Sequence, residues 1–338
     1  MTAIPAAPAV VGMRRSFWRR TRDARTAWLY LIPALLVMGI ITFYPLLFQT
    51  YMSFTDFGLR NLRPGAPAAP FVGLNNYINI LASNIAIPNF NFLRLILFNL
   101  WWAFSNVVVH VILGVLIAVL LNTPGLWFKR FYRAMFILPV VIPAIIVATV
   151  WRNMYDPENG AINLGLQAIG VLFRIPAEAL QIDWLRQVND PIGFIPLPLA
   201  YYAMLLANTW LGWPLNAVVA TGALQSIPHE LYEAAEMDGA GPWQRFRNIT
   251  LTYLRPAMLP YAIYGFVITF NLFHISYFLS GGGPFGRTEL LVTQAYRLVN
   301  EQNLYGAAAA FSIIMFFVLL AITIVTNRLA RATAGADL

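Results

Sequence analysis

The chain has 338 residues, of which 59% are hydrophobic and only 11% are charged, and its net charge is +8. A soluble domain carries about 25% charged residues and could not bury so much apolar surface, so a single soluble domain is excluded. The absence of cysteine excludes disulfides, thiolate metal sites and a cysteine nucleophile.

Six long apolar stretches lack Asp, Glu, Lys and Arg, and each can supply the roughly 20 residues that a membrane-spanning helix needs. They predict an all-α integral membrane protein with six transmembrane helices. The predicted spans are 28–52, about 95–121, 134–154, 198–222, 257–279 and 306–327.

The segments outside these spans have a different composition. Within the loop 53–94, the charge-free run Pro64 to Leu93 holds six Asn and four Pro. Amides and proline-freed backbone are costly in lipid, so we expect an external loop. The run Asn159 to Phe173 is too short to span and predicts a short helix on the outer surface.

The distribution of charge predicts the orientation. With the N-terminal tail 1–27 and the C-terminal tail 328–338 in the cytoplasm, the cytoplasmic segments hold 14 basic and 6 acidic residues. The outer segments hold 8 of each sign. The whole net positive charge then lies inside, as the positive-inside rule requires.

The predicted membrane interior offers little chemistry. Its ionisable residues are His110 and His274, and a lone histidine in a span is more often packed and hydrogen-bonded than functional. The sequence has no phosphate-binding loop of the form G-x-x-x-x-G-K-[ST] and no catalytic constellation in the spans. We therefore expect a non-enzyme, and any active transport must draw its energy from another chain.

The charged segment 226–255, between the predicted fourth and fifth spans, is the most informative. Ser226 and Pro228 favour a helix start, and Gly239 followed by Gly241 and Pro242 stops it. A second short helix is expected at about 243–251. From the residues alone, an ordinary amphipathic loop helix and a helix that docks on a partner are equally supported.

This segment resembles the EAA loop of ABC-importer permeases, which reads E-A-A, three residues, G, nine residues, I, one residue, L-P. The matching positions are Glu233, Ala234, Ala235, Gly239, Ile249 and Leu251. Thr252 replaces the final proline.

The resemblance implies that the loop is a coupling helix seated in a cleft of a cytoplasmic ATPase. The residues implied to carry the docking are Glu233, Ala234, Ala235, Asp238 and Gly239. In that family the glutamate pairs with an ATPase arginine, the alanines permit a close fit, and the glycine makes the turn.

Other motifs extend the resemblance over nearly the whole chain. Phe71–Tyr77, Arg133–Pro143 and Gly281–Pro284 resemble the sugar-importer permeases, and Asn208–Pro214 resembles the maltose-type subunit. The resemblance implies the type I ABC-importer permease fold, with residues 95–327 as the core. It also implies that the protein lies in the cell inner (cytoplasmic) membrane with both termini in the cytoplasm.

The same resemblance implies a sugar site halfway through the membrane. Its positions here are Asn208, Leu211, Gly212, Leu215, Gly265, Thr269 and Asn271. Three of them, Leu215, Gly265 and Thr269, differ from the maltose-contacting residues of the family. Neutral polar groups with nearby aromatics suit an uncharged carbohydrate, such as maltose, a maltooligosaccharide or a related α-glucoside.

The implied partners are a second six-span permease subunit, a dimer of ATPase subunits, an external sugar-binding protein and the sugar; nucleic acid is not expected. This chain is expected to bind no cofactor and no metal, because ATP and Mg belong to the ATPase. The alternatives are an ATP-independent secondary carrier or channel, an importer permease for another neutral or phosphorylated solute, and a membrane scaffold.

Overall fold

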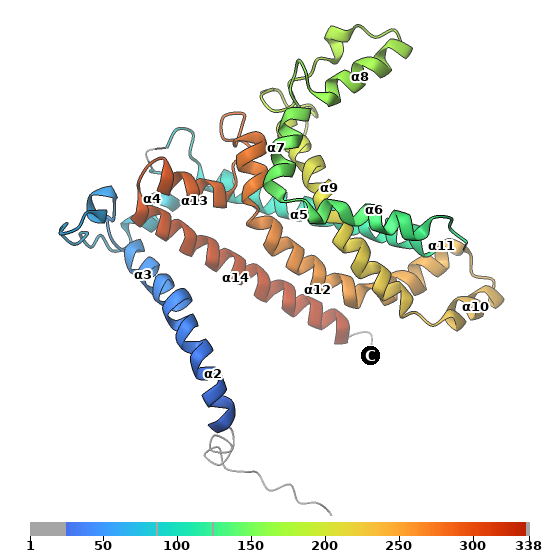
Figure 1. The fold of residues 1–338 in the computed structure, drawn as a ribbon, viewed down its shortest axis with the longest axis horizontal. Helices are drawn as coiled ribbons and strands as arrows, with labels where there is room; N and C mark the ends of the chain where they lie inside the picture. Colours follow the sequence, from blue (N-terminus) through green and yellow to red (C-terminus); the bar gives the residue numbers. More distant parts are fainter. Residues whose placement is uncertain (1–24, 86, 124, 336–338) are drawn as a thin grey trace, which may run out of the picture. The chain divides into compact units, whose positions relative to one another are not determined.

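The computed structural model describes residues 25–85, 87–123 and 125–335 (Figure 1). These residues form helices and loops with no strand, apart from one isolated bridge between Thr55 and Phe71, which confirms the all-α prediction. Most of the predicted tail 1–27 and the last three residues of the tail 328–338 lie outside the described residues. The chain divides after Met52 into two compact units.

The described residues of the first unit, 25–52, form one apolar helical rod. It contains α2 (Arg25–Met38), a π-helical stretch at Gly39–Phe43 and α3 (Tyr44–Ser53), which follow one another without a break. Its apolar window has none of its residues buried within the chain. An apolar helix of this length that remains uncovered is expected where lipid surrounds it.

The second unit is built around four long helices. They are α5 (Phe92–Asn122), α9 (Leu199–Gln225), α12 (Leu251–Phe270) and α14 (Tyr305–Gly335). Helix α5 packs along α9, and α12 contacts α5, α9 and α14. Trp102, Met204, Phe270 and Phe311 are completely buried among these helices.

Two of the predicted spans are interrupted. The range 134–154 corresponds to α6 (Lys129–Val141) and α7 (Ala144–Met154), which meet at an angle of 95°. Pro143 explains the bend, because a proline disfavours helical geometry in the residue before it, and Ile142 is extended. The range 257–279 is broken after Phe270, and a π-helical stretch follows at Ile275–Ser280.

Three helical segments of the described residues are long and apolar enough to cross a membrane, at 28–53, 92–122 and 305–328. The bent pair α6–α7 is a fourth candidate. Helices α9 and α12 are 27 and 20 residues long but contain proline and polar residues, and they do not meet the same test. The count of six spans therefore stays a prediction.

Shorter helices occupy the two ends of the second unit. At one end are α4 (Asn75–Leu81) and α13 (Leu291–Asn300), and both contact α14. The opposite end carries α10 (His229–Met237) and α11 (Pro242–Arg245) (Figure 1). Helix α8 (Ala161–Leu172) is the short helix expected within 159–173.

Candidate functional site: a two-helix loop, a helix seam and the outer loops

The loop between α9 and α12 consists of two short helices and a glycine turn. Helix α10 ends where Gly239 adopts a φ of +78°, a region that glycine enters without the penalty of a Cβ atom. The N–H groups of Gly239 and Ala240 donate to the carbonyls of Glu236 and Ala235 and close the helix end. Helix α11 and a π-helical stretch at Phe246–Thr250 then run into α12 without a break.

The side chains of this loop are largely exposed. No residue of α10 is buried, and Met237 and Trp243 are 88% and 70% exposed. Glu233 and Ala234 are exposed and Ala235 is half-buried. Large apolar side chains exposed among charged groups are typical of a surface that binds another protein.

The inner side of the loop is anchored to the chain. Leu231 and Tyr232 pack on a buried cluster that includes Leu224 and Leu254. The hydroxyls of Tyr232 and Thr250 lie 2.9 Å apart and join α10 to the π-helical stretch. This contact links α10 to the segment that continues into α12.

Two side-chain pairs complete the loop. Glu236 bonds Arg245 at 2.8 Å, and the Glu233 carboxylate lies 2.9 Å from Nδ1 of His229. Glu233, His229 and Glu236 are exposed, and contacts of exposed side chains are weak, whereas Arg245 is only 25% exposed. Glu233 can therefore exchange its histidine for a better partner at small cost.

A seam of small and polar residues joins α5 to α9. The Asn208 amide donates to Oδ1 of Asn106 at 2.7 Å, deep in the core. One turn further along both helices, the His110 ring lies over Gly212, where a Cβ would come within 2.0 Å of it. Since the residue numbers on the two helices rise together, α5 and α9 run parallel along this seam.

The seam continues for another turn with equally close approach. A Cβ on Gly114 would lie 2.4 Å from Cβ of Asn216 and would meet the α9 backbone. His110 is 6% exposed and hydrogen-bonded to the backbone of Asn208, which fits the expectation of a packed histidine. Its Nε2 atom is buried and has no partner. Small residues at such positions let helices in a membrane approach closely.

The seven predicted sugar positions divide between two environments. Asn208 and Thr269 are buried within the chain, and Gly212 and Gly265 face α5, nearest to His110 and Val107. Leu211 is half-buried on another face of α9. Leu215 is 43% exposed, and Asn271 is exposed and bonds the carbonyl of Val267. The structure thus does not gather all seven on one open surface.

Asn99 is a structural residue that the sequence analysis missed. Its amide donates to the carbonyl of Phe270 at the end of α12, and its Oδ1 accepts the N–H of Leu291 at the start of α13. Helix ends leave such backbone groups without internal partners, so a buried amide between two ends satisfies both. The signal available in the sequence was a polar side chain within an otherwise apolar run.

The loops at the other end of the unit are held by their own side chains. The Asn163 amide donates to the carbonyls of Pro157 and Ile182, and its Oδ1 accepts the indole N–H of Trp184. Asn163 is completely buried, and its three bonds tie α8 to the loop before it at Pro157 and to the segment after it at Ile182 and Trp184.

Two arginines secure the glycine-rich loop Gly281–Gly286. Arg287 donates to the carbonyls of Val188 and Pro196 and to Asp190 at 2.6 Å. Arg297 bonds Glu289, Glu301 and the carbonyl of Gly281. Burial disfavours the Arg297 cation, but the two carboxylates outweigh it and raise its pKa above the ordinary value.

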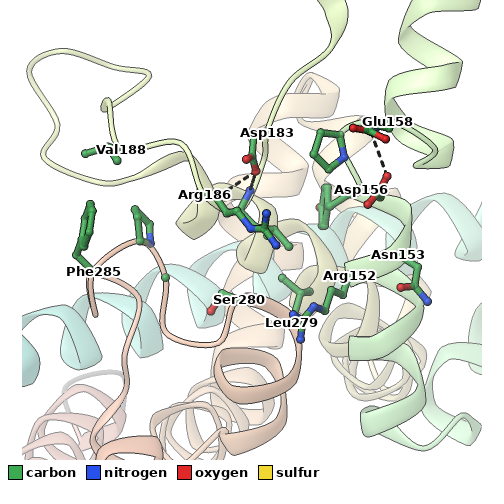
Figure 2. A pocket seen from close by; sticks show the side chains of 15 residues that line it. Arg152, Asn153, Asp156, Glu158, Asp183, Arg186, Val188, Leu279, Ser280 and Phe285 are labelled. Atoms are coloured by element: carbon green, nitrogen blue, oxygen red, sulfur yellow. Dashed lines mark hydrogen bonds between the residues drawn. The ribbon is translucent and has the colours of Figure 1, made fainter.

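A cavity of about 660 Å³ opens between the loop after α7 and the segment Ser280–Phe285 (Figure 2). Asp156 and Asp183 line it, and each caps its own turn by accepting two backbone N–H groups. Within the described residues, no group of three or more His, Asp or Glu side chains could hold a metal ion.

The second unit is a bundle of helices. One end carries the exposed two-helix loop 226–255, and the other end carries loops that internal hydrogen bonds hold in place. Residues 110–335 match the family of the binding-protein-dependent transport system inner membrane component. The chain belongs to this family and is an inner-membrane protein, as the resemblance of its EAA loop predicts.

Several transport permeases of known function are similar to this chain in sequence. The chain is 30% identical over 305 residues to the maltodextrin transport system permease protein MalC of Streptococcus pneumoniae. The match covers 88% of this chain and 67% of MalC. The chain is 31% identical to the trehalose/maltose transport system permease protein MalF of Thermococcus litoralis, over 92% of this chain and 95% of that protein.

The galactooligosaccharides transport system permease protein GanP of Bacillus subtilis is 31% identical, over 84% of this chain and 65% of its own length. The chain therefore spans about two thirds of MalC and GanP. Among solved structures, a bacterial ABC transporter for import of the acidic polysaccharide alginate has a chain that matches with a TM-score of 0.72 and 21% identity. That match covers 93% of this chain and 98% of the other. At this identity the likeness establishes the fold.

Proposed function

We propose that this chain is the permease subunit of an ATP-driven sugar importer, in which it forms half of the translocation pathway. The observation that carries the proposal is the exposed helix α10, which presents Glu233, Ala234 and Ala235 and ends at the left-handed turn of Gly239. The relatives named as maltodextrin, trehalose/maltose and galactooligosaccharide permeases support a sugar as the substrate.

The coupling follows from the anchoring of the loop. A cleft in a cytoplasmic ATPase receives α10, where an arginine replaces His229 as the partner of Glu233, and Asp238 lies beside the turn. When ATP and Mg close the ATPase dimer, α10 moves. The Tyr232–Thr250 contact and the continuous run into α12 pass that motion to the pathway helices.

The sugar contacts are proposed at the less buried positions of the predicted site. Leu211 and Leu215 lie one turn apart on α9, and Asn271 follows the end of α12. Asn208, Gly212, Gly265 and Thr269 shape the wall behind these positions by setting how α9 and α12 pack on α5. The substrate class is a neutral oligosaccharide, such as a maltooligosaccharide or a related α-glucoside.

The proposal requires partners. A second six-span permease supplies the other half of the pathway, the ATPase dimer binds the coupling loops, and an external sugar-binding protein delivers the substrate to the outer loops. Both termini and the loop 226–255 are then cytoplasmic. This chain binds neither ATP nor a metal and has no catalytic residue.

The test is gentle purification of the tagged chain from its native membrane, with mass spectrometry of the co-purifying proteins and ATP hydrolysis assayed with candidate sugars. We expect a second permease, a phosphate-loop ATPase and hydrolysis stimulated by one class of oligosaccharide. Leu215→Trp should reduce the stimulation without releasing the ATPase. A stable chain that purifies alone and transports without ATP would contradict the proposal.

A further inference from the structure

A largely apolar groove of about 390 Å³ lies between α6 and α9. Its walls include Phe136, Trp213 and Val218, and the rings of Phe136 and Trp213 meet edge to face with centroids 5.1 Å apart. Gly222 also lines the groove, and a Cβ there would meet no atom within 4 Å. The groove is therefore open space that a chain of methylene groups can occupy.

One end of the groove is cationic. Among the residues that the structure describes, Arg133 is the only charged side chain that lines it, and Lys129 and Arg130 precede it by one turn on the same side of α6. Among the described residues, none of these three forms an ion pair. Trp127 and Phe128, just before α6, are 81% and 69% exposed.

This arrangement matches a membrane interface. Aromatic rings and basic side chains are enriched where a span meets the lipid headgroups. Gln225, the last residue of α9, also lines the groove, so the groove lies at the end of the unit that carries the loop 226–255. That end is cytoplasmic if the proposed function holds, and the cytoplasmic leaflet carries the anionic lipids.

We propose that the groove binds an anionic phospholipid of the cytoplasmic leaflet. An acyl chain lies against Phe136, Trp213 and Val218, and the headgroup phosphate accepts hydrogen bonds from Arg133, with Lys129 and Arg130 adding to the attraction. The three cations without a carboxylate partner select an anionic headgroup over a zwitterionic one. The choice of leaflet rests on the proposed function, whereas the binding itself does not.

The test uses the complex that co-purifies with the tagged chain, placed in nanodiscs of phosphatidylethanolamine with a minor share of phosphatidylglycerol. Native mass spectrometry then counts the lipids retained on this chain. We expect the wild type to retain phosphatidylglycerol in preference to phosphatidylethanolamine. Loss of one basic contact in Arg133→Gln should reduce that retention about fivefold.

A second variant distinguishes the contribution of the apolar groove to lipid binding from that of the basic side chains. Gly222→Leu fills the groove, leaves the three cations in place and should reduce retention of both lipids. The matched controls are Arg174→Gln, at an exposed arginine outside the groove, and Gly165→Leu, at a glycine in α8 that also has no atom within 4 Å of an added Cβ. Both controls should retain phosphatidylglycerol like the wild type.

The proposal is overturned if Arg133→Gln and Gly222→Leu retain as much phosphatidylglycerol as the controls. It is also overturned if the variants release the ATPase or the second permease while lipid retention stays constant, because a protein then covers the groove. Lipid retention is measured without sugar or ATP, so the result does not depend on transport activity. A chain that holds the lipid but brings no ATPase would therefore refute the proposed function and leave this inference standing.

Discussion

The two loop regions of the second unit are built on opposite principles. In the loops that the sequence predicts to be external, here called the outer loops, Asn163, Arg287 and Arg297 hydrogen-bond to partners in the same chain. In the loop 226–255, no residue of α10 is buried, and Trp243 lies exposed at the surface. The loops predicted to be external hold their shape through their own contacts, whereas the loop 226–255, predicted to be internal, leaves its first helix without a buried residue.

Because of this difference, we expect substitutions in the outer loops to lower stability and substitutions in the loop 226–255 to impair coupling. A buried amide with three partners cannot be removed without leaving polar groups unsatisfied, and that costs folding free energy. An exposed helix with surface ion pairs contributes little to folding, so its residues are free to serve an interface. Substitutions in the two regions should therefore fail in different assays.

The largest expected effect is the loss of coupled uptake in Gly239→Pro. Proline holds φ near −65°, whereas Gly239 has a φ of +78°, so the turn after α10 cannot form. We expect sugar uptake in proteoliposomes to fall at least about 100-fold, which corresponds to about 2.7 kcal/mol. The denaturation midpoint should stay close to that of the wild type.

Gly65→Pro is the matched control, because Gly65 has a φ of +77° and lies in the outer loop 53–94. It should leave uptake intact. Glu233→Lys should behave like Gly239→Pro, since it reverses the charge that, in the proposed function, pairs with an arginine of the ATPase. Normal uptake in both inner-loop variants would contradict the assignment of the coupling loop.

The next effect concerns stability at the outer end. Asn163→Ala removes the three hydrogen bonds of a completely buried amide and leaves the N–H of the half-buried Trp184 without its acceptor. We expect a loss of about 3 kcal/mol in unfolding free energy, measured by denaturant titration in detergent. Asn159→Ala, at an exposed side chain nearby, should change it by less than about 0.5 kcal/mol.

A smaller loss is expected for Arg287→Gln. The substitution abolishes the charge-assisted bond to Asp190, while the neutral amide can keep one carbonyl acceptor. The expected destabilisation is about 1.5 kcal/mol in the same titration. The control is Arg186→Gln, because Arg186 is exposed and forms no ion pair within the described residues. A loss as small as that of the control would show that the loop Gly281–Gly286 is not held by Arg287.

The smallest effect is expected for Glu236→Gln in the inner loop. Glu236 pairs with Arg245 across the turn, but its side chain is 69% exposed. We expect less than about 0.5 kcal/mol of destabilisation, and the value should shrink further in high salt. A loss above about 1.5 kcal/mol would mean that the inner loop is held by its own contacts, which would remove the contrast between the two regions.

Much of the architecture could be read from the sequence because its causes are local. The apolar runs predict helices that avoid water, and the glycine and proline residues of 226–255 mark where α10 ends and α11 begins. The spacing of six positions in the loop 226–255, from Glu233 to Leu251, resembles the EAA loop and predicts the family, which the match over residues 110–335 confirms. None of these inferences needs knowledge of which helix lies beside which.

The roles of Asn208 and Gly212 could not be read in this way. Their partners, Asn106 and His110, lie 102 residues earlier in the chain, and the rotation of α9 about its axis decides which face meets them. A small or polar residue in a span predicts a pathway or a close helix contact equally well. Packing against α5 places Asn208 and Gly212 inside the unit and leaves Leu215 exposed. In lipid, no contact with water selects which face of a helix points outward, so the rotation of α9 is set by its packing on neighbouring helices.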